Sequence, residues 1–269
     1  VISIIEKLKL TTIVSDDCSP VTSDPILREV SALPRTTVIR NLHNQGIARG
    51  LNQGLEFAAS HQFEWLLTVD QDSDLDSDYA RAILTAAQSH EALWIQRPAV
   101  GVIAPHQIQD ASGVMTYPTK LVDSVPVTQE VIQSGALWRV SALRQIGGFD
   151  ENLGIDAVDA AACLHLREAG YLVALTDNVE LHHNLGDSHQ VNILGKTIMV
   201  TNHSPARRAT MVRNRLRLAP AEFKQSPVHA ARTLRRVTVN SLMGGLTGND
   251  RWQKTKGSLS GLRRKKLDE

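Results

Sequence analysis

Short apolar runs alternate with segments of helical periodicity along most of the chain. The runs are rich in aliphatic and β-branched residues, which is typical of buried strands. We expect strands at residues 11–15, 36–41, 65–69, 100–105, 171–176 and 178–182. Between them, apolar residues recur three or four positions apart, as in amphipathic helices. We expect helices at residues 1–10, 47–60, 77–89, 139–148 and 154–169. This alternation predicts an α/β fold built on an open sheet.

Two regions depart from this alternation. Residues 106–132 lack strong periodicity, and we expect irregular loops and antiparallel strands there. From Val228 to Leu246, apolar residues recur among arginines, which predicts a basic amphipathic helix.

The composition is that of a globular protein. The chain has 269 residues, of which 42% are hydrophobic and 21% are charged, so it can bury a sizeable core. It has no uninterrupted apolar run of membrane-spanning length and no signal-peptide pattern. Cys18 and Cys163 lie far apart in sequence and form no CxxC pair, which argues against a cysteine-built zinc site. We therefore expect a cytoplasmic protein from a reducing compartment.

The net charge of +1 hides a strong asymmetry. Residues 206–269 carry 16 Lys and Arg against 4 Asp and Glu, whereas residues 1–205 carry 13 against 24. The basic end closes on Arg263, Arg264, Lys265 and Lys266. A basic end on an acidic body suggests an anionic partner such as phosphate, nucleic acid or anionic lipid.

An acidic stretch follows the strand expected at residues 65–69. Asp70, Asp72 and Asp74 occupy alternate positions directly after it. Because ligands of an open α/β sheet lie outside the carboxyl ends of its strands, chemistry is expected at this point. Two carboxylates so spaced can hold Mg²⁺ or Mn²⁺, which takes further ligands from water and substrate phosphates. The alternative is an acidic loop in which Asp76 or Ser77 caps the next helix.

Polar residues also follow the first two expected strands. Asp16 and Asp17 come after residues 11–15, where carboxylates suit recognition of a base or ribose but equally suit capping of the turn. Gly46 begins the next helical segment and would let the backbone approach a phosphate or sugar closely. No GxGxxG or Walker A pattern occurs here, which argues against a dinucleotide-binding dehydrogenase or a P-loop protein.

Further along, two pairs of residues are candidates for chemistry. Asp156 and Asp159 are three positions apart, so we expect them on one helical face. Either they cap the helix and complement its dipole, or one of them is a general base. His182 and His183 are adjacent, and such histidines are more often surface or core residues. One of them, arriving at a two-carboxylate site, would complete a mixed oxygen and nitrogen metal shell.

Four arginines lie close together after residue 205: Arg207, Arg208, Arg213 and Arg215. Guanidinium forks match phosphate oxygens, so these side chains are candidates for binding a diphosphate. The alternative is a solvated basic helix.

Taken in order, these motifs resemble those of the family 2 glycosyltransferases, and within them the rhamnosyltransferase-like group. The matching stretches are DDCS at 16–19, NQGIARGLNQGL at 44–55, LLTVDQDSDL at 66–75, SGALW at 134–138, IGGFDENLGIDAVDAA at 146–161, HNLG at 183–186 and HSPARRATMVRN at 203–214. The resemblance covers nearly the whole chain. Within these stretches, the sequences DQDS at 70–73 and IDAVD at 155–159 favour rhamnose as the sugar.

The resemblance implies a GT-A fold, a Rossmann-like α/β sandwich that binds a nucleotide-sugar. It assigns residues 1–218 to the catalytic domain and residues 219–269 to a helical basic extension. The family begins with a strand that this sequence does not show, so we expect a sheet without its first N-terminal strand. The sequence also departs from the family pattern at Ala161, His165 and Ala209–Thr210.

The resemblance also implies roles for individual residues. Asp159 falls on the catalytic base, with Asp156 as the neighbouring candidate. Asp70, Asp72 and His183 fall where the family handles its metal. The implied contacts to the nucleotide-sugar are Asp16, Asp17, Asn44, Gly46, Asn52, Asp70, Arg207, Arg208 and Arg213.

From these features we predict an inverting glycosyltransferase that uses Mg²⁺ or Mn²⁺ and a nucleotide-sugar donor, dTDP-L-rhamnose in the first instance. Its acceptor would be a cell-surface polysaccharide or lipid-linked glycan, reached by peripheral membrane contact through the basic C-terminal tail. The alternative for the tail is a helix packed on the catalytic domain with its charges in water. The alternative is a degenerate, non-catalytic nucleotide-sugar-binding or scaffold protein of the same fold. We do not expect a nucleic-acid partner, because the tail offers only Phe223 and Trp252 for base stacking.

Overall fold

A computed structural model of the chain describes residues 1–92, 99–110, 113–183, 188–193, 196–201, 204–246, 256 and 260–261. The described chain divides into two units. Unit 1 consists of Val1–Gly154 and Val158–Asn184, and unit 2 of Ile155–Ala157 and Leu185–Glu269.

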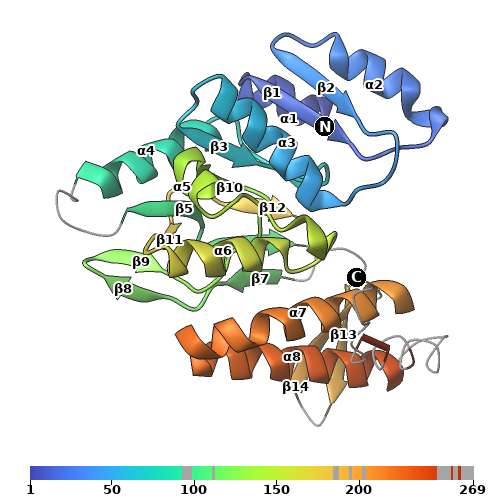
Figure 1. The fold of residues 1–269 in the computed structure, drawn as a ribbon, viewed down its shortest axis with the longest axis vertical. Coiled ribbons are helices and arrows are strands. Elements are labelled where there is room, and N and C mark those ends of the chain that lie inside the picture. The colour runs from blue at the N-terminus through green and yellow to red at the C-terminus, as the bar shows by residue number, and fades with distance from the viewer. Residues whose placement is uncertain are drawn as a thin grey trace. The chain divides into compact units, whose positions relative to one another are not determined.

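The N-terminal part of unit 1 is a parallel pair of strands flanked by helices (Figure 1). Strands β1 and β2 pair in register, with Thr12 opposite Thr36 and Asp16 opposite Arg40. Helix α3 packs against both β1 and β3, the latter belonging to another sheet. The elements are α1 (Ile2–Leu8), β1 (Thr12–Asp16), η1 (Val21–Ser23), α2 (Asp24–Ser31), β2 (Thr36–Arg40) and α3 (Ile47–Ser60).

A six-stranded sheet forms the centre of unit 1, in the order β3-β10-β5-β11-β9-β8. Strand β10 is antiparallel to both of its neighbours, while β5 and β11 run parallel. All residues of β5 are buried, as expected for a central strand covered on both faces. The strands are β3 (Trp65–Thr68), β5 (Val100–Pro105), β8 (Lys120–Val122), β9 (Val125–Val127), β10 (Ala136–Arg139) and β11 (Leu172–Thr176).

A smaller sheet, in the order β4-β12-β6-β7, completes unit 1. Its antiparallel pairing places His183 of β12 opposite Ser73 of β4, and so beside the acidic stretch. The strands are β4 (Ser73–Asp74), β6 (Gln107–Asp110), β7 (Gly113–Thr116) and β12 (Leu181–His183). The remaining helices of unit 1 are α4 (Tyr79–Ala92), α5 (Val140–Gln145), η2 (Glu151–Leu153) and α6 (Val158–Glu168).

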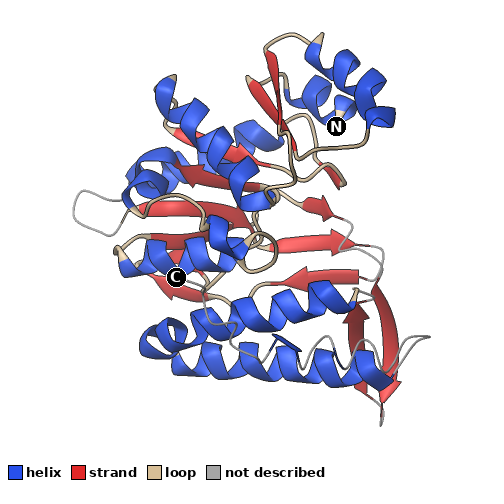
Figure 2. Ribbon diagram, turned by 45° about the vertical axis from the view of Figure 1, so that its right-hand side comes forward, coloured by secondary structure: helices blue, strands red, loops and turns tan. Residues whose placement is uncertain are grey.

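Unit 2 contains a hairpin and a pair of long helices. The hairpin joins β13 (Ser188–Ile193) and β14 (Lys196–Thr201). Helices α7 (Pro205–Gln225) and α8 (Pro227–Leu246) pack along each other, side by side in both views (Figure 1, Figure 2). Each begins with proline, whose missing N–H is not needed at the first helical position. Among the described residues, neither these helices nor any other is long and apolar enough to span a bilayer.

The predicted α/β fold is confirmed, and so is each strand expected from an apolar run, to within a few residues. The helix expected at 154–169 begins later, at Val158. Strand β10 is not among the strands expected from apolar runs. The boundary predicted after residue 218 falls inside α7, whereas the two units divide near residue 184.

Candidate functional site

The three predicted metal ligands meet where β3 ends and β4 pairs with β12. Ligand atoms of Asp70, Asp72 and His183 all lie within 4.8 Å of one another. Nε2 of His183 lies 3.9 Å from Oδ2 of Asp70, and its Nδ1 lies 3.6 Å from Oδ1 of Asp72. Two carboxylates and one imidazole form a donor set suited to a hard divalent cation such as Mg²⁺ or Mn²⁺.

Hydroxyl groups hold this cluster in place. Ser73 Oγ shares a 2.8 Å hydrogen bond with Nδ1 of His183 and a 2.6 Å hydrogen bond with Oγ of Ser134. Ser134 Oγ also accepts a hydrogen bond from the backbone N–H of Asp70 at 2.9 Å. Such outer partners fix the ring orientation of metal-binding histidines and leave the other nitrogen for the ion. The structure therefore fits a metal at this position.

Burial differs between the two carboxylates. The Asp72 side chain is 52% exposed, whereas that of Asp70 is 33% exposed. Burial raises the pKa of Asp70, and the nearby charge of Asp72 adds to this effect, while His183 and the amide of Gln133 oppose it. A buried carboxylate whose charged form is disfavoured gains from a cation beside it.

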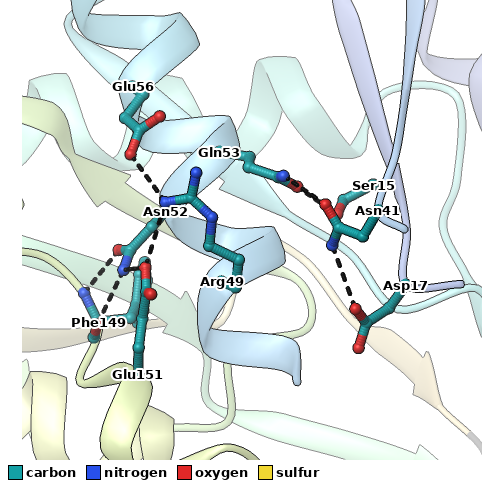
Figure 3. Close-up of polar contacts among 9 residues, drawn as sticks. All are labelled: Ser15, Asp17, Asn41, Arg49, Asn52, Gln53, Glu56, Phe149 and Glu151. Carbon is teal, nitrogen blue, oxygen red and sulfur yellow. Dashed lines mark hydrogen bonds and ion pairs between the residues drawn. The ribbon is translucent and has the colours of Figure 1, made fainter. Parts of the chain in front are cut away.

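Asp17 anchors the loop between β2 and α3 (Figure 3). Its Oδ1 accepts hydrogen bonds from the Asn41 side-chain amide at 3.1 Å and from the Gln45 N–H at 2.7 Å, and its Oδ2 accepts from the Gly46 N–H at 2.8 Å. Partial burial alone would raise the pKa of Asp17, but these three hydrogen bonds outweigh it and lower the pKa. The carboxylate thus has a structural role, and its predicted contact with a base or ribose stays a prediction.

A chain of buried amides connects this anchor to α3 (Figure 3). Asn41 Oδ1 accepts a hydrogen bond from Gln53 Nε2 at 2.7 Å, and Gln53 Oε1 accepts one from Ser15 Oγ at 2.7 Å. The sequence does not mark Asn41, Gln53 or Ser15 as members of a buried network. Their signal was weak, since only the burial of the strand ends and of α3 makes amides there need partners.

Asn52 joins α3 to the turn at Phe149–Glu151 (Figure 3). Its amide donates to Phe149 O at 2.9 Å and accepts from Phe149 N–H at 2.8 Å, as a backbone group would. It also donates to Oε1 of Glu151 at 2.8 Å, and Arg49 pairs with Glu151 and Glu56. Asn52 therefore fixes this turn, and its predicted role in donor binding is not tested by these contacts.

Gly46 brings two loops of unit 1 together. It has a φ of 84°, and a Cβ at this position would lie 2.5 Å from the carbonyl oxygen of Gly154. The backbone that Gly46 approaches here is thus protein backbone, and a phosphate or sugar contact stays a prediction. Asn44 precedes it with an exposed side chain.

Asp16 is buried at the end of β1, with 6% of its surface exposed. Its Oδ2 lies 3.2 Å from Nε of Arg40, and its Oδ1 accepts a 3.3 Å hydrogen bond from Ser19 N–H. These contacts match the turn-capping alternative for Asp16.

The prediction that Asp156 and Asp159 share a helical face is wrong. Asp159 lies in the first turn of α6 and is partly buried, whereas Asp156 precedes the helix with a φ of 65°. Ala157 also has a φ of 65°, so the chain turns through two left-handed residues before α6 begins. Asp156 instead belongs to unit 2 and pairs with Arg207 through two contacts of 3.2 Å.

The predicted diphosphate arginines have different surroundings. Arg207 pairs with Asp156, Arg208 donates to Asn240 O at 3.1 Å, and Arg213 is exposed and donates to Thr210 Oγ1 at 3.2 Å. Their joint contact with a diphosphate stays a prediction. Of the matched HNLG stretch, only His183 lies among the described residues, and the basic run at 263–266 lies outside them.

Comparisons with known proteins agree with these features. The family model described as "Glycosyl transferase family 2" matches residues 1–147. The chain is 28% identical over 181 residues to the dTDP-rhamnosyl transferase RfbF of Shigella flexneri, an alignment that covers 64% of this chain and 58% of that protein. The match thus spans less than two thirds of the relative's length.

Solved structures share the fold at low sequence identity. S. aureus TarS 1–349 has a TM-score of 0.57 at 12% identity, covering 97% of this chain and 74% of that one. The same protein in complex with UDP has a TM-score of 0.57 at 14% identity, over 94% and 72% of the two chains. GalNAc-T7 with UDP, GalNAc and Mn²⁺ has a TM-score of 0.53 at 10% identity, over 93% of this chain and 48% of that one. The fold is therefore the GT-A fold.

Proposed function

We propose that this chain, which belongs to glycosyl transferase family 2, moves a sugar from a nucleotide-sugar donor to a hydroxyl group of a glycan. The observation that carries the proposal is the cluster of Asp70, Asp72 and His183 at the end of β3. Its position at the carboxyl end of a sheet strand is where α/β folds bind their ligands.

The donor we propose is dTDP-L-rhamnose. The support is the resemblance to a protein named dTDP-rhamnosyl transferase, at 28% identity, together with the DQDS and IDAVD stretches of this sequence. In this proposal Asp16, Asp17, Asn44, Gly46 and Asn52 shape the donor pocket by holding the loops around α3. Arg207 and Arg213 would contact the diphosphate, whereas Arg208 is buried and donates to the Asn240 carbonyl oxygen.

Asp159 acts as the general base. Its carboxylate removes the proton from the acceptor hydroxyl while that oxygen attacks the anomeric carbon, which inverts the configuration of the sugar. Its place in the first turn of α6, partly buried, holds the carboxylate on a rigid element. Asp156 is the less favoured candidate, because Arg207 already holds both of its oxygens.

Asp70, Asp72 and His183 would hold the divalent cation. When bound, the cation offsets negative charge that develops on the departing diphosphate. Ser73 and Ser134 keep His183 and the Asp70 backbone in the positions that this requires.

The acceptor we propose is a cell-surface polysaccharide or lipid-linked glycan, met at the inner face of the cell membrane. Exposed arginines on α8, at positions 232, 235 and 236, supply cations for contact with anionic lipid. A cytoplasmic location is part of this proposal.

Donor hydrolysis and transfer assays test the function. The protein is incubated with dTDP-L-rhamnose, or with UDP-sugars as controls, in Mn²⁺ or in EDTA, and release of the nucleoside diphosphate is measured. We expect turnover of dTDP-L-rhamnose in Mn²⁺ and its loss in EDTA. Metal-dependent nucleotide binding without turnover of any donor or acceptor would instead support the non-catalytic alternative.

A further inference from the structure

The packed face of α7 in unit 2 carries charges where helix pairs usually hold aliphatic residues. Positions 208, 211, 212 and 215 follow the i, i+3, i+4, i+7 spacing of one helical face. They are occupied by Arg208, Met211, Val212 and Arg215, and all four line a cavity between the helices. Burying a guanidinium group costs free energy unless hydrogen bonds or charges compensate it, and Arg208 donates a hydrogen bond to the Asn240 carbonyl oxygen at 3.1 Å.

The facing surface of α8 repeats this arrangement. Positions 233, 236, 237 and 240 have the same spacing and line the same cavity. They are occupied by Thr233, Arg236, Val237 and Asn240. The two faces therefore contribute three arginines and two neutral polar side chains to one seam.

The seam encloses a cavity of about 200 Å³, which Asp156 and Ala157 also line. Three guanidinium groups and one carboxylate give its wall two net positive charges, and the net charge is the same when Arg207 and Glu222, which pair with wall residues, are included. Arg207, outside the wall, already pairs with that carboxylate through two contacts of 3.2 Å, which weakens its effect on the cavity.

The three arginines lie at different depths. Arg208 is 5% exposed, the Arg215 side chain is 20% exposed, and Arg236 is exposed. Burial lowers the pKa of Arg208, so its cationic form is disfavoured where it lies. Arg215 lies 3.6 Å from the buried carboxylate of Glu222. Arg208 is thus the most buried cation of the cavity, and Arg236 is the most exposed. Arg215 lies between them in exposure, and Glu222 partly offsets its charge.

We propose that this cavity of unit 2 binds a phosphate group, on a ligand other than the nucleotide-sugar donor. Guanidinium forks pair with phosphate oxygens through two parallel hydrogen bonds, and three forks surround the space. The two net positive charges match a phosphate monoester better than a carboxylate. The volume is below the roughly 300 Å³ at which sites for drug-sized ligands begin, so one phosphate with a short organic part fits.

The apolar side chains of the wall indicate that the phosphate belongs to an organic molecule. Met211, Val212 and Val237 lie among the arginines and offer contacts that inorganic phosphate does not use. A soluble phosphate monoester and a lipid headgroup share this chemistry, and the experiment separates them.

The first experiment is calorimetric titration of the full chain with inorganic phosphate and with glycerol 3-phosphate. Arg236→Gln removes the outermost fork, and we expect it to weaken binding of both ligands about tenfold, the order of one charge-assisted hydrogen bond. Arg235→Gln is the matched control, since Arg235 is exposed on the same helix but does not line the cavity. We expect this control to stay within about twofold of the unchanged protein.

The second experiment uses vesicles that contain phosphatidic acid, a monoester, or phosphatidylglycerol, a diester, at equal surface charge. If the phosphate belongs to a lipid headgroup, we expect the protein to prefer vesicles with phosphatidic acid. We then expect Arg236→Gln to abolish this preference. Arg235→Gln should lower binding to both lipids by the same factor. No preference, together with phosphate binding in the titration, assigns the site to soluble phosphate monoesters.

Three results would overturn the proposal. The first is the absence of saturable binding of both phosphates, and the second is an equal loss of binding in Arg236→Gln and Arg235→Gln. The third is competition, in which dTDP with Mn²⁺ displaces the phosphate and Arg236→Gln weakens dTDP binding as well, because the cavity would then serve the donor. If the protein turns over no donor, the phosphate proposal can still be tested, because the titration measures binding and does not need enzymatic activity.

Discussion

Asp72 is the most exposed member of the metal cluster, so its removal separates metal binding from folding. We expect Asp72→Ala to weaken Mn²⁺-dependent binding of dTDP strongly, because one of the three ligand groups is lost. The free energy of unfolding should change by less than about 0.5 kcal/mol, as for other surface substitutions. Calorimetry with and without Mn²⁺ and denaturant unfolding measure the two quantities.

Asp74→Ala is the control for this substitution. Asp74 belongs to the same acidic stretch but is outside the metal cluster, and its Oδ1 lies 2.6 Å from Nζ of Lys7. It should leave Mn²⁺-dependent binding unchanged. If Asp72→Ala retains the same Mn²⁺-dependent affinity as Asp74→Ala, Asp72 is not a metal ligand.

Asp159 is the residue on which the chemical step depends. We expect Asp159→Asn to lower kcat at least about a hundredfold, because an amide cannot accept the proton of the acceptor hydroxyl. Binding of dTDP with Mn²⁺ should stay close to that of the unchanged protein. Turnover that survives within about tenfold, or roughly 1.4 kcal/mol of barrier, would move the role of base to Asp156.

At the residue scale, charge patterns were predictable and their partners were not. The alternate spacing of Asp70 and Asp72 after a buried strand, together with the family resemblance, predicted a metal site. Ser134 and Gln133 contact Asp70 from a loop more than sixty positions away in sequence. Ser134 begins the matched SGALW stretch, but nothing in that stretch indicates its contact with Asp70. Polar side chains in loops have many possible partners, and only the fold selects among them.

Among the elements, the start of α3 depends on Gly46. Gly46→Ala forces a side chain into a φ of 84° and places Cβ 2.5 Å from the Gly154 carbonyl oxygen. We expect a loss of stability of more than about 2 kcal/mol, from backbone strain and the displaced loop together. Gly147→Ala is the control, with a φ of 85° and open space around the added Cβ. Its loss should be limited to the strain, and equal losses in the two variants would contradict a tight contact between the loops.

Asp17 makes the loop before α3 sensitive to acid. Because its pKa is lowered in the folded protein, the stability that it contributes is fully present above its unfolded pKa of about 3.9 and is lost as the pH falls through the folded pKa. The difference in unfolding free energy between the unchanged protein and Asp17→Asn should therefore be constant well above pH 3.9 and shrink below it. Urea unfolding over a pH series measures this difference, and a difference that stays flat or grows in acid would rule out the effect.

Strands that consist of a continuous apolar run could be predicted from the sequence. A strand that forms only through contacts with distant segments could not. Strand β10 is four residues long, and it becomes a strand because β3 and β5 accept it between them. Trp138 within it is buried and meets Phe149 edge-on, with ring centroids 5.2 Å apart. A run so short has no readable period, so its state depends on neighbours distant in sequence.

The molecule as a whole combines an acidic N-terminal part with a basic C-terminal part. Composition alone indicated this division, and the helical C-terminal region that carries the positive charge is present as expected. The apolar residues expected to form one face of α8, beginning with Val228, are not the residues that the fold buries. Ala230 and Thr233 are buried, whereas Val228 is 63% exposed. Periodicity indicated an amphipathic helix, but the orientation of the helix depends on its packing against α7.

Charge asymmetry on this scale predicts salt-dependent binding to anionic membranes. Each arginine near an anionic surface contributes about 1 kcal/mol, so Arg232→Gln with Arg235→Gln should weaken binding to phosphatidylglycerol vesicles about thirtyfold at low salt. High salt should weaken binding of the unchanged protein as well, because exposed charges are screened within about 10 Å at 0.1 M ionic strength. Vesicle sedimentation measures both effects.

The control removes two exposed arginines from unit 1, Arg28 and Arg144, by the same change to glutamine. Net charge then falls equally in both double variants, so any difference between them comes from where the charges lie. We expect the unit 1 variant to sediment with the vesicles like the unchanged protein. If the two variants lose binding equally, attraction depends on net charge alone. If neither does, and the unchanged protein shows no preference for anionic lipid, the arginines of α8 serve solubility and helix packing and the membrane contact is ruled out.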